Sequence, residues 1–134
     1  MEMIRRVGAI LLATVWISAS EFLRNQLLLG GVWVEHYRRL GLVFPASPAN
    51  GALWGVWSLL LAVAISLLAE RFTLLGTAAL AWLMAFPMMW VVIGNLGVLP
   101  LAALPWAVPL SLLEVLVAAL IVGRLGPKRE TARA

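Results

Sequence analysis

Cysteine is absent from the sequence, histidine occurs once, and only 12% of the residues are charged. Without cysteine the chain cannot form disulfides, thiolate metal sites or a cysteine nucleophile. One histidine is too few for a histidine-rich metal site within a single chain, so we expect neither a metal nor another cofactor. The charged fraction is about half of the quarter that is usual in soluble domains, which argues against a water-soluble fold.

Hydrophobic residues make up 63% of the 134 residues, and the mean hydropathy is +1.01. They gather in four runs, at residues 7–30, 51–69, 72–93 and 101–123. A helix needs about 20 apolar residues to cross the hydrocarbon core of a bilayer. Backbone polar groups must also be hydrogen-bonded within lipid. The sequence therefore predicts an all-α integral membrane protein, a single domain of four transmembrane helices in an antiparallel bundle.

The distribution of Lys and Arg predicts the orientation of these helices. With both termini in the cytoplasm, seven basic residues lie on the inner side and two on the outer side. The inner set is Arg5, Arg6, Arg71, Arg124, Lys128, Arg129 and Arg133, and the outer set is Arg38 and Arg39. We expect a multi-pass protein of a bacterial inner membrane with a cytoplasmic tail at residues 124–134. Residues 1–20 also have features of a secretory signal, but apolar sequence resumes at residues 27–34, so we expect an uncleaved first helix.

The stretch at residues 33–50 mixes aromatic and charged residues. Its aromatic and apolar side chains recur at helical spacing, at Trp33, Tyr37, Leu40 and Phe44. Charged residues fall between them, and Pro45 and Pro48 follow. This pattern predicts an amphipathic segment that lies at the outer membrane interface and ends at the prolines.

Two charged residues interrupt the first apolar run. Glu21 and Arg24 are one helical turn apart, and Asn25 follows Glu21 by one turn, so the three side chains lie close together on a helix. Unpaired and facing lipid, the two charges would cost about 5–7 kcal/mol. This cost predicts that the face carrying Glu21 and Asn25 turns inward, toward polar partners or water.

A second intramembrane acid, Glu114, lies within the fourth apolar run. Arg24 cannot fully neutralise both acids, so we expect at least one of them to hold a proton at neutral pH. Such an acid is a candidate proton carrier. The alternative is a purely structural role, in which the charges fix one arrangement of the helices.

Further polar residues are expected at a similar depth in the bundle. Asn50, Trp54 and Ser58 begin the second predicted helix, Asn95 ends the third, and His36 lies above them. Pro87 cannot donate a backbone hydrogen bond and is expected to kink the third helix. The predicted ligand-binding site consists of Glu21, Arg24, Asn25, His36, Asn50, Trp54, Ser58, Asn95 and Glu114.

Small residues recur every four positions on two of the predicted helices. They are Ser58, Ala62 and Ser66 on the second, and Thr73, Thr77, Ala81 and Ala85 on the third. Such stripes allow helix backbones to approach closely within a membrane.

These patterns leave three functions open. The first is binding or transport of a small polar ligand, anionic or zwitterionic, with possible proton coupling. The second is an enzyme acting on a lipid or isoprenoid, with Glu21, His36 or Glu114 as acid and base and Arg24 holding an oxyanion. The third is an accessory subunit of a larger membrane complex. We expect membrane lipids to surround the chain, and either a homo-oligomer or a larger membrane complex as its assembly. We expect no nucleic acid partner, because the sequence has no basic face with exposed aromatic residues.

Overall fold

The computed structural model describes residues 1–127, and within this range all regular secondary structure is helical. Residues 128–134, with the predicted tail residues Lys128, Arg129 and Arg133, lie outside the described part. The helices are α1 (Glu2–Phe22), η1 (Leu23–Leu28), α2 (Gly30–Arg39), α3 (Pro48–Ala69), α4 (Leu74–Ala85), α5 (Pro87–Asn95), η2 (Leu101–Ala103) and α6 (Leu104–Leu125).

Four helical segments are long and apolar enough to cross a membrane: Glu2–Leu28, Pro48–Ala69, Leu74–Asn95 and Leu101–Leu125. The prediction of an all-helical chain with four such segments is confirmed. The first segment begins five residues earlier than the predicted residue 7, and the last begins with the short 3-10 helix η2.

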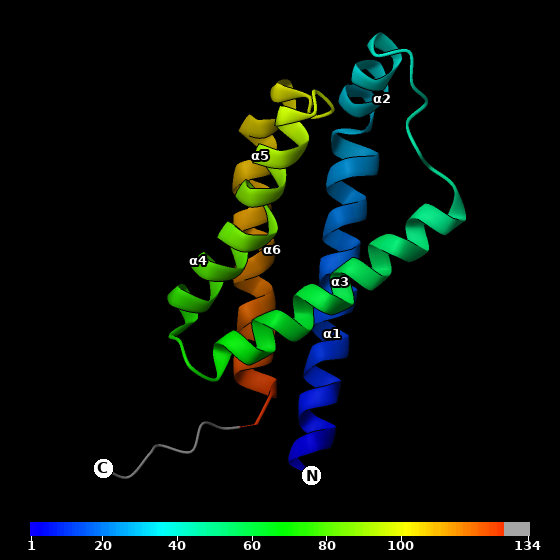
Figure 1. The fold of residues 1–134 in the computed structure, drawn as a ribbon. Helices are drawn as coiled ribbons and strands as arrows, with labels where there is room; N and C mark the ends of the chain where they lie inside the picture. Colours follow the sequence, from blue (N-terminus) through cyan, green and yellow to red (C-terminus); the bar gives the residue numbers. More distant parts are fainter. Residues whose placement is uncertain (128–134) are drawn as a thin grey trace.

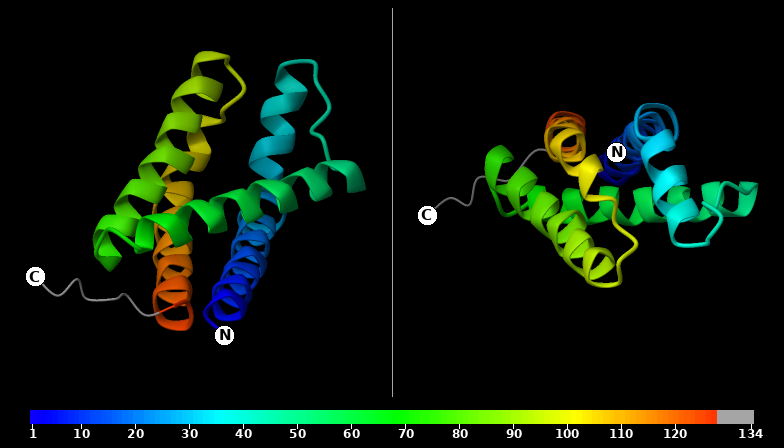
Figure 2. Two further views of the ribbon diagram at one scale, coloured as in Figure 1. Left: turned by 60° about the horizontal axis from the view of Figure 1, so that its bottom comes forward. Right: turned by 90° about the horizontal axis from the view of Figure 1, so that it is seen from above.

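Helices α1 and α6 form the centre of the arrangement. Helix α1 packs against α3 and α6, and α6 also packs against α3 and α4 (Figure 1). Helix α3 runs diagonally across α1, and the views in Figure 2 show the same crossing. The start of α1 and the end of α6 lie at one end of the molecule, and α2 and the end of α5 lie at the other (Figure 1).

Small side chains make these crossings possible. Ala13 of α1, Ala62 of α3 and Ala118 of α6 are completely buried within one core cluster. The predicted stripes contribute to the same interior, because Ser58 and Ala62 on α3 and Thr77 and Ala81 on α4 are buried. Only a methyl or hydroxyl group separates the backbones at such positions, so dispersion contacts between helices are numerous.

The third candidate span is interrupted at Phe86. Pro87, the first residue of α5, has no N–H to donate to the preceding turn, and Phe86 adopts φ −110° and ψ −67°. The predicted kink at Pro87 therefore takes the form of a break between α4 and α5. The break turns the Phe86 side chain into the interior, where only 1% of its surface is exposed.

The segment at residues 33–50 differs from its prediction. Its helix ends at Arg39 rather than at the prolines, because Gly41 adopts a left-handed conformation with φ +71°. The N–H of Gly41 donates to the Arg38 carbonyl and that of Leu42 donates to the Tyr37 carbonyl, which is the Schellman way of ending a helix. Phe44 lies in the non-helical stretch that follows and packs back on Trp33 and Tyr37, with ring centroids 6.0 and 5.3 Å apart.

The charged face of α2 is organised around Glu35. Its carboxylate accepts hydrogen bonds of 2.8–2.9 Å from Arg38 and 2.8 Å from Arg39. Hydrogen bonding to these two guanidinium groups lowers the pKa of Glu35 to about 2. Arg38 and Arg39 are thus both paired to an acid on their own helix.

We predict that Ala62→Leu destabilises the protein by about 1–3 kcal/mol, because the larger side chain overpacks the crossing of α3 with α1. The free energy of unfolding is measured in detergent by titration with a denaturant. Ala52→Leu is the matched control, since Ala52 lies on the same helix and is exposed. Equal stability of the two variants would show that the Ala62 crossing is not tightly packed.

Candidate functional site

Helix α1 continues into a π-helical stretch, η1, which contains Arg24 and Asn25. The N–H of Leu29 donates to the carbonyl of Arg24 at 2.8 Å, a bond that spans five residues instead of four. A π-helical turn holds one more residue than an α-helical turn would, and such turns are frequent at functional sites. The irregular backbone therefore coincides with the polar side chains of the first span.

Arg24 joins two acids from different helices. Its Nη2 is hydrogen-bonded to Glu21 Oε1, and its Nη1 lies 2.5 Å from Glu114 Oε2. Only 4% of Arg24, 5% of Glu21 and 1% of Glu114 is exposed. We refer to these three residues as the charged cluster.

Aromatic and amide groups surround the charged cluster. The Arg24 guanidinium lies over the Phe86 ring, 5.1 Å from its centroid, which adds a cation–π contact. Asn25 donates to Glu21 Oε2 at 2.7 Å and accepts from the Trp33 indole at 3.1 Å. A relay of hydrogen bonds therefore runs from Trp33 through Asn25 and Glu21 to Arg24.

Glu114 is less completely bonded than Glu21. Its backbone carbonyl accepts from the Trp16 indole at 3.0 Å, and its Oε2 accepts from Arg24. Its Oε1 is buried and has no hydrogen-bond partner in the described part of the chain. A buried carboxyl oxygen left in this state has unused capacity to bind a proton or a donor.

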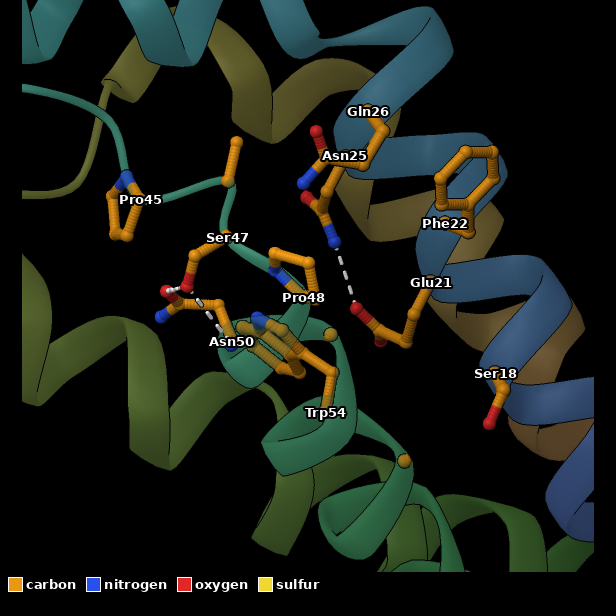
Figure 3. Close-up of a pocket in the computed structure, with 13 residues that line it drawn as sticks. Ser18, Glu21, Phe22, Asn25, Gln26, Pro45, Ser47, Pro48, Asn50 and Trp54 are labelled. Carbon is orange, nitrogen blue, oxygen red and sulfur yellow. Dashed lines mark hydrogen bonds between the residues drawn. The ribbon is translucent and has the colours of Figure 1, made fainter.

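A pocket of about 400 Å³ lies between the first span and the start of α3. One wall is formed by Glu21, Asn25 and their neighbours, and the other by the loop at 45–47 and the first turns of α3 (Figure 3). Its lining residues are Ser18, Glu21, Phe22, Asn25, Gln26, Pro45, Ala46, Ser47, Pro48, Asn50, Gly51, Trp54 and Gly55.

The far wall of this pocket is held by the N-terminal cap of α3. The Ser47 hydroxyl accepts from the Asn50 N–H at 3.4 Å and donates to Asn50 Oδ1 at 2.7 Å. Ser47 followed by Pro48 in the first turn is a sequence typical of a helix start. These contacts place Asn50 and Trp54 opposite Glu21 (Figure 3).

Four of the predicted site residues line this pocket: Glu21, Asn25, Asn50 and Trp54. Arg24 and Glu114 adjoin it through Glu21 but are not part of its lining. Arg24 is directed to the interior, toward Glu114 and Phe86, so the charged group on the pocket wall is an acid.

The other three predicted residues lie elsewhere. The His36 ring is hydrogen-bonded to the Gly97 carbonyl at 2.9 Å, because α2 lies beside the turn between α5 and α6. Asn95 is exposed at the end of α5. Ser58 is fully buried, and its hydroxyl donates to the Trp54 carbonyl of its own helix at 2.9 Å. A similar depth along the helix axes does not fix the direction of a side chain, so these three residues do not meet at the pocket.

Three contributors were not predicted from sequence. Trp33 was assigned to the amphipathic segment, but its indole bonds to Asn25. Phe86 lies under Arg24 because of the break before Pro87. Ser47 was detectable, since a serine before proline at a helix start is a common cap. Within residues 1–127 no group of three or more metal-ligating side chains comes together.

A second pocket, of about 730 Å³, lies between α3, α4 and the end of α6. Arg6, Glu70, Thr77 and Arg124 are among its lining residues, and Arg6 is paired with Glu70. Thr77 Oγ1 is buried there without a hydrogen-bond partner in the described residues. This pocket is separate from the charged cluster and shares no lining residue with the first pocket.

Comparison with known proteins identifies no relative: no family model, no curated protein and no solved structure matches this chain. The site's geometry and chemistry therefore carry the functional argument.

We predict that Arg24→Gln destabilises the protein by about 3–5 kcal/mol, because two buried carboxyl groups lose their shared partner. Detergent-solubilised protein is unfolded with a denaturant to measure the change. The combined variant Glu21→Gln, Arg24→Gln and Glu114→Gln should recover most of this loss, because no buried charge is left unpaired. A triple variant as unstable as Arg24→Gln would mean that the charges are not the source of the effect.

Proposed function

We propose that the chain is an integral membrane protein whose four spans form an antiparallel bundle, with both termini in the cytoplasm of a bacterium. The four long apolar helices support insertion. The Lys and Arg distribution supports the orientation, although three of the inner basic residues lie outside the described residues. In this orientation α2 and the pocket between η1 and α3 lie toward the outer side.

We further propose that this pocket binds a small polar ligand and that binding serves transport across the membrane. The observation that carries this proposal is the pairing of Glu21 and Asn25 on one wall with Asn50 and Trp54 on the other, around a volume of about 400 Å³. Polar groups that converge on a partly apolar cavity are typical of small-molecule sites. Because such groups are costly within a membrane, their presence favours a functional role.

The lining favours a ligand that donates hydrogen bonds over the anionic ligand considered from sequence. An anion would need a cationic group on the wall, but Arg24 is engaged by two acids and faces away from the pocket. The lining offers the Glu21 carboxyl together with the amides of Asn25, Gln26 and Asn50. The acceptor oxygens of these groups suit a neutral or cationic donor.

The two alternative functions have less support. The enzyme hypothesis needs His36 and a carboxylate at one cavity, but His36 bonds to Gly97 and does not line the pocket. The accessory-subunit hypothesis predicts an unsatisfied polar face or a small-residue stripe exposed for a partner, and Ala62, Thr77 and Ala81 of the two stripes are buried inside the chain.

We predict that Asn50→Cys reacts with a membrane-impermeant thiol reagent added to the outside of intact cells. The chain contains no cysteine, so the background is zero. Ser66→Cys, which lines the second pocket, is the matched control and should react only after the membrane is permeabilised. An Asn50→Cys variant that reacts only after permeabilisation would contradict the proposed orientation, and one that never reacts would contradict an open pocket.

For the ligand, we predict that a donor-bearing probe, either propionamide or propylammonium, raises the unfolding temperature of the purified protein, whereas propionate does not. A ligand that binds only the folded state shifts this temperature with its concentration. The shift should shrink in Asn50→Ala and persist in Asn95→Ala, because Asn95 is outside the pocket. Failure of all three probes, or stabilisation by propionate alone, would contradict the proposed ligand class.

A further inference from the structure

The charged cluster carries an imbalance that neither helix packing nor the proposed ligand pocket explains. It contains one guanidinium and two carboxyl groups, so with both acids ionised its net charge is −1. All three residues are at least 95% buried. A net charge at this depth is costly, so the cluster requires one additional positive charge.

Within the described residues, no other ionisable side chain of α1 or of α3 to α6 supplies that charge. Helices α3, α4 and α5, all within the described residues, contain no Asp, Glu, His, Lys or Arg. On α6 the other charged residue is Arg124, which is exposed near the opposite end and lines the second pocket. On α1 the others are Glu2, Arg5 and Arg6, at the start of the helix. Arg24 is therefore the cation that faces Glu21 and Glu114.

A proton is one way to supply the missing charge. Both carboxyl groups bond to the same guanidinium, and Glu114 Oε1 has no hydrogen-bond partner among residues 1–127. A proton held by the pair makes the cluster neutral without moving any helix. Two carboxyl groups that share a site titrate as a pair, and one proton is retained by the pair as a whole.

A cationic ligand is the second way to supply the missing positive charge, because Glu21 belongs both to the charged cluster and to the pocket lining. Its Oε1 is hydrogen-bonded to Arg24 inside the cluster, and the same residue lines the pocket. The Trp54 ring lies on the opposite wall, and so does Asn50, whose amide oxygen accepts from the Ser47 hydroxyl (Figure 3). A carboxylate, an aromatic face and amide oxygens are the groups that bind an alkylammonium ion.

We propose that the pocket takes a primary alkylammonium ion and that its binding releases the proton shared by Glu21 and Glu114. The exchange balances: one cation enters, one proton leaves to solvent, and the net charge of the cluster with its bound ion stays at zero. This inference rests on the proposed function of the pocket and adds the ligand's charge and its coupling to protons. In a membrane it would make the chain an exchanger of an organic cation for a proton.

The test is titration of the purified full chain with propylammonium in weakly buffered solution that contains a pH indicator. Propylammonium resembles the lysine side chain, whose pKa is about 10.4, so the probe itself releases no proton near neutral pH. We expect release of about one proton per bound ion, and an affinity that rises about tenfold per pH unit while the cluster still holds its proton. Binding without proton release, with an affinity independent of pH, would overturn the exchange.

Variants separate the charge argument from the pocket. Glu114→Gln leaves Arg24 balanced by Glu21 alone, so propylammonium should bind about 5- to 150-fold more weakly and release no proton. Glu35→Gln is the matched control, because Glu35 is an acid outside the pocket, and should match the original chain in both measurements. Unchanged proton release in Glu114→Gln would also overturn the proposal.

The probes distinguish this inference from the proposed function. If propionamide stabilises the protein in a way that depends on Asn50 and propylammonium does not bind, the ligand pocket stands and the cation exchange is wrong. If neither probe binds, both are wrong. Should Glu114→Gln fail to fold, the pH dependence of propylammonium binding to the unaltered chain still tests the exchange, because an affinity independent of pH would overturn it.

Discussion

The bridge from Arg24 to Glu21 and Glu114 is the constraint on which the other features of the site depend. It links the first and last spans through charged groups that cannot separate without leaving a buried charge uncompensated. The bridge fixes α1 against α6, directs the guanidinium away from the pocket, and leaves Glu21 as the charged group on the pocket wall. The acidic character of this pocket wall is thus a consequence of how one arginine is shared by two acids.

The packing around this bridge uses very small side chains. Ala13, Ala62 and Ala118 are fully buried in one core cluster, which also contains the Phe86 ring. Phe86 reaches Arg24 because the helix breaks before Pro87. The close-packed core thus contacts the charged cluster through Phe86, and the pocket adjoins it through Glu21.

Several parts of this structure follow from the sequence. Helix number and approximate bounds follow from run length and hydropathy, since few structures satisfy backbone hydrogen bonds in lipid. The convergence of Glu21, Arg24 and Glu114 follows from the cost of exposing charge to lipid. The inward placement of Ala62 and Thr77 follows from their spacing. Each of these features depends on the pattern within one helix or on the free energy of placing a charge in lipid. None of them requires knowledge of which side chains lie across the interface.

The features that escaped prediction depend on several elements at once. The helical spacing of Trp33, Tyr37 and Phe44 suggested one continuous helix, but Gly41 ends it early and Phe44 returns by a turn. His36 was placed by its depth, whereas its direction depends on where Gly97 lies. Arg24 has a long side chain with several orientations available, and its partners selected one that faces away from the pocket.

The π-helical stretch has a consequence for the half of the site that lies beyond it. Relative to a regular α-helix, η1 accommodates one additional residue, and each residue of an α-helix corresponds to a rotation of about 100°. The number of residues in η1 therefore sets the rotation of α2 about its axis. This rotation decides whether the Trp33 indole reaches Asn25, as much as the identity of the two residues does. In chains descended from the same ancestor, an alignment gap at residues 23–28 would signal a rebuilt binding pocket even where every polar side chain is retained.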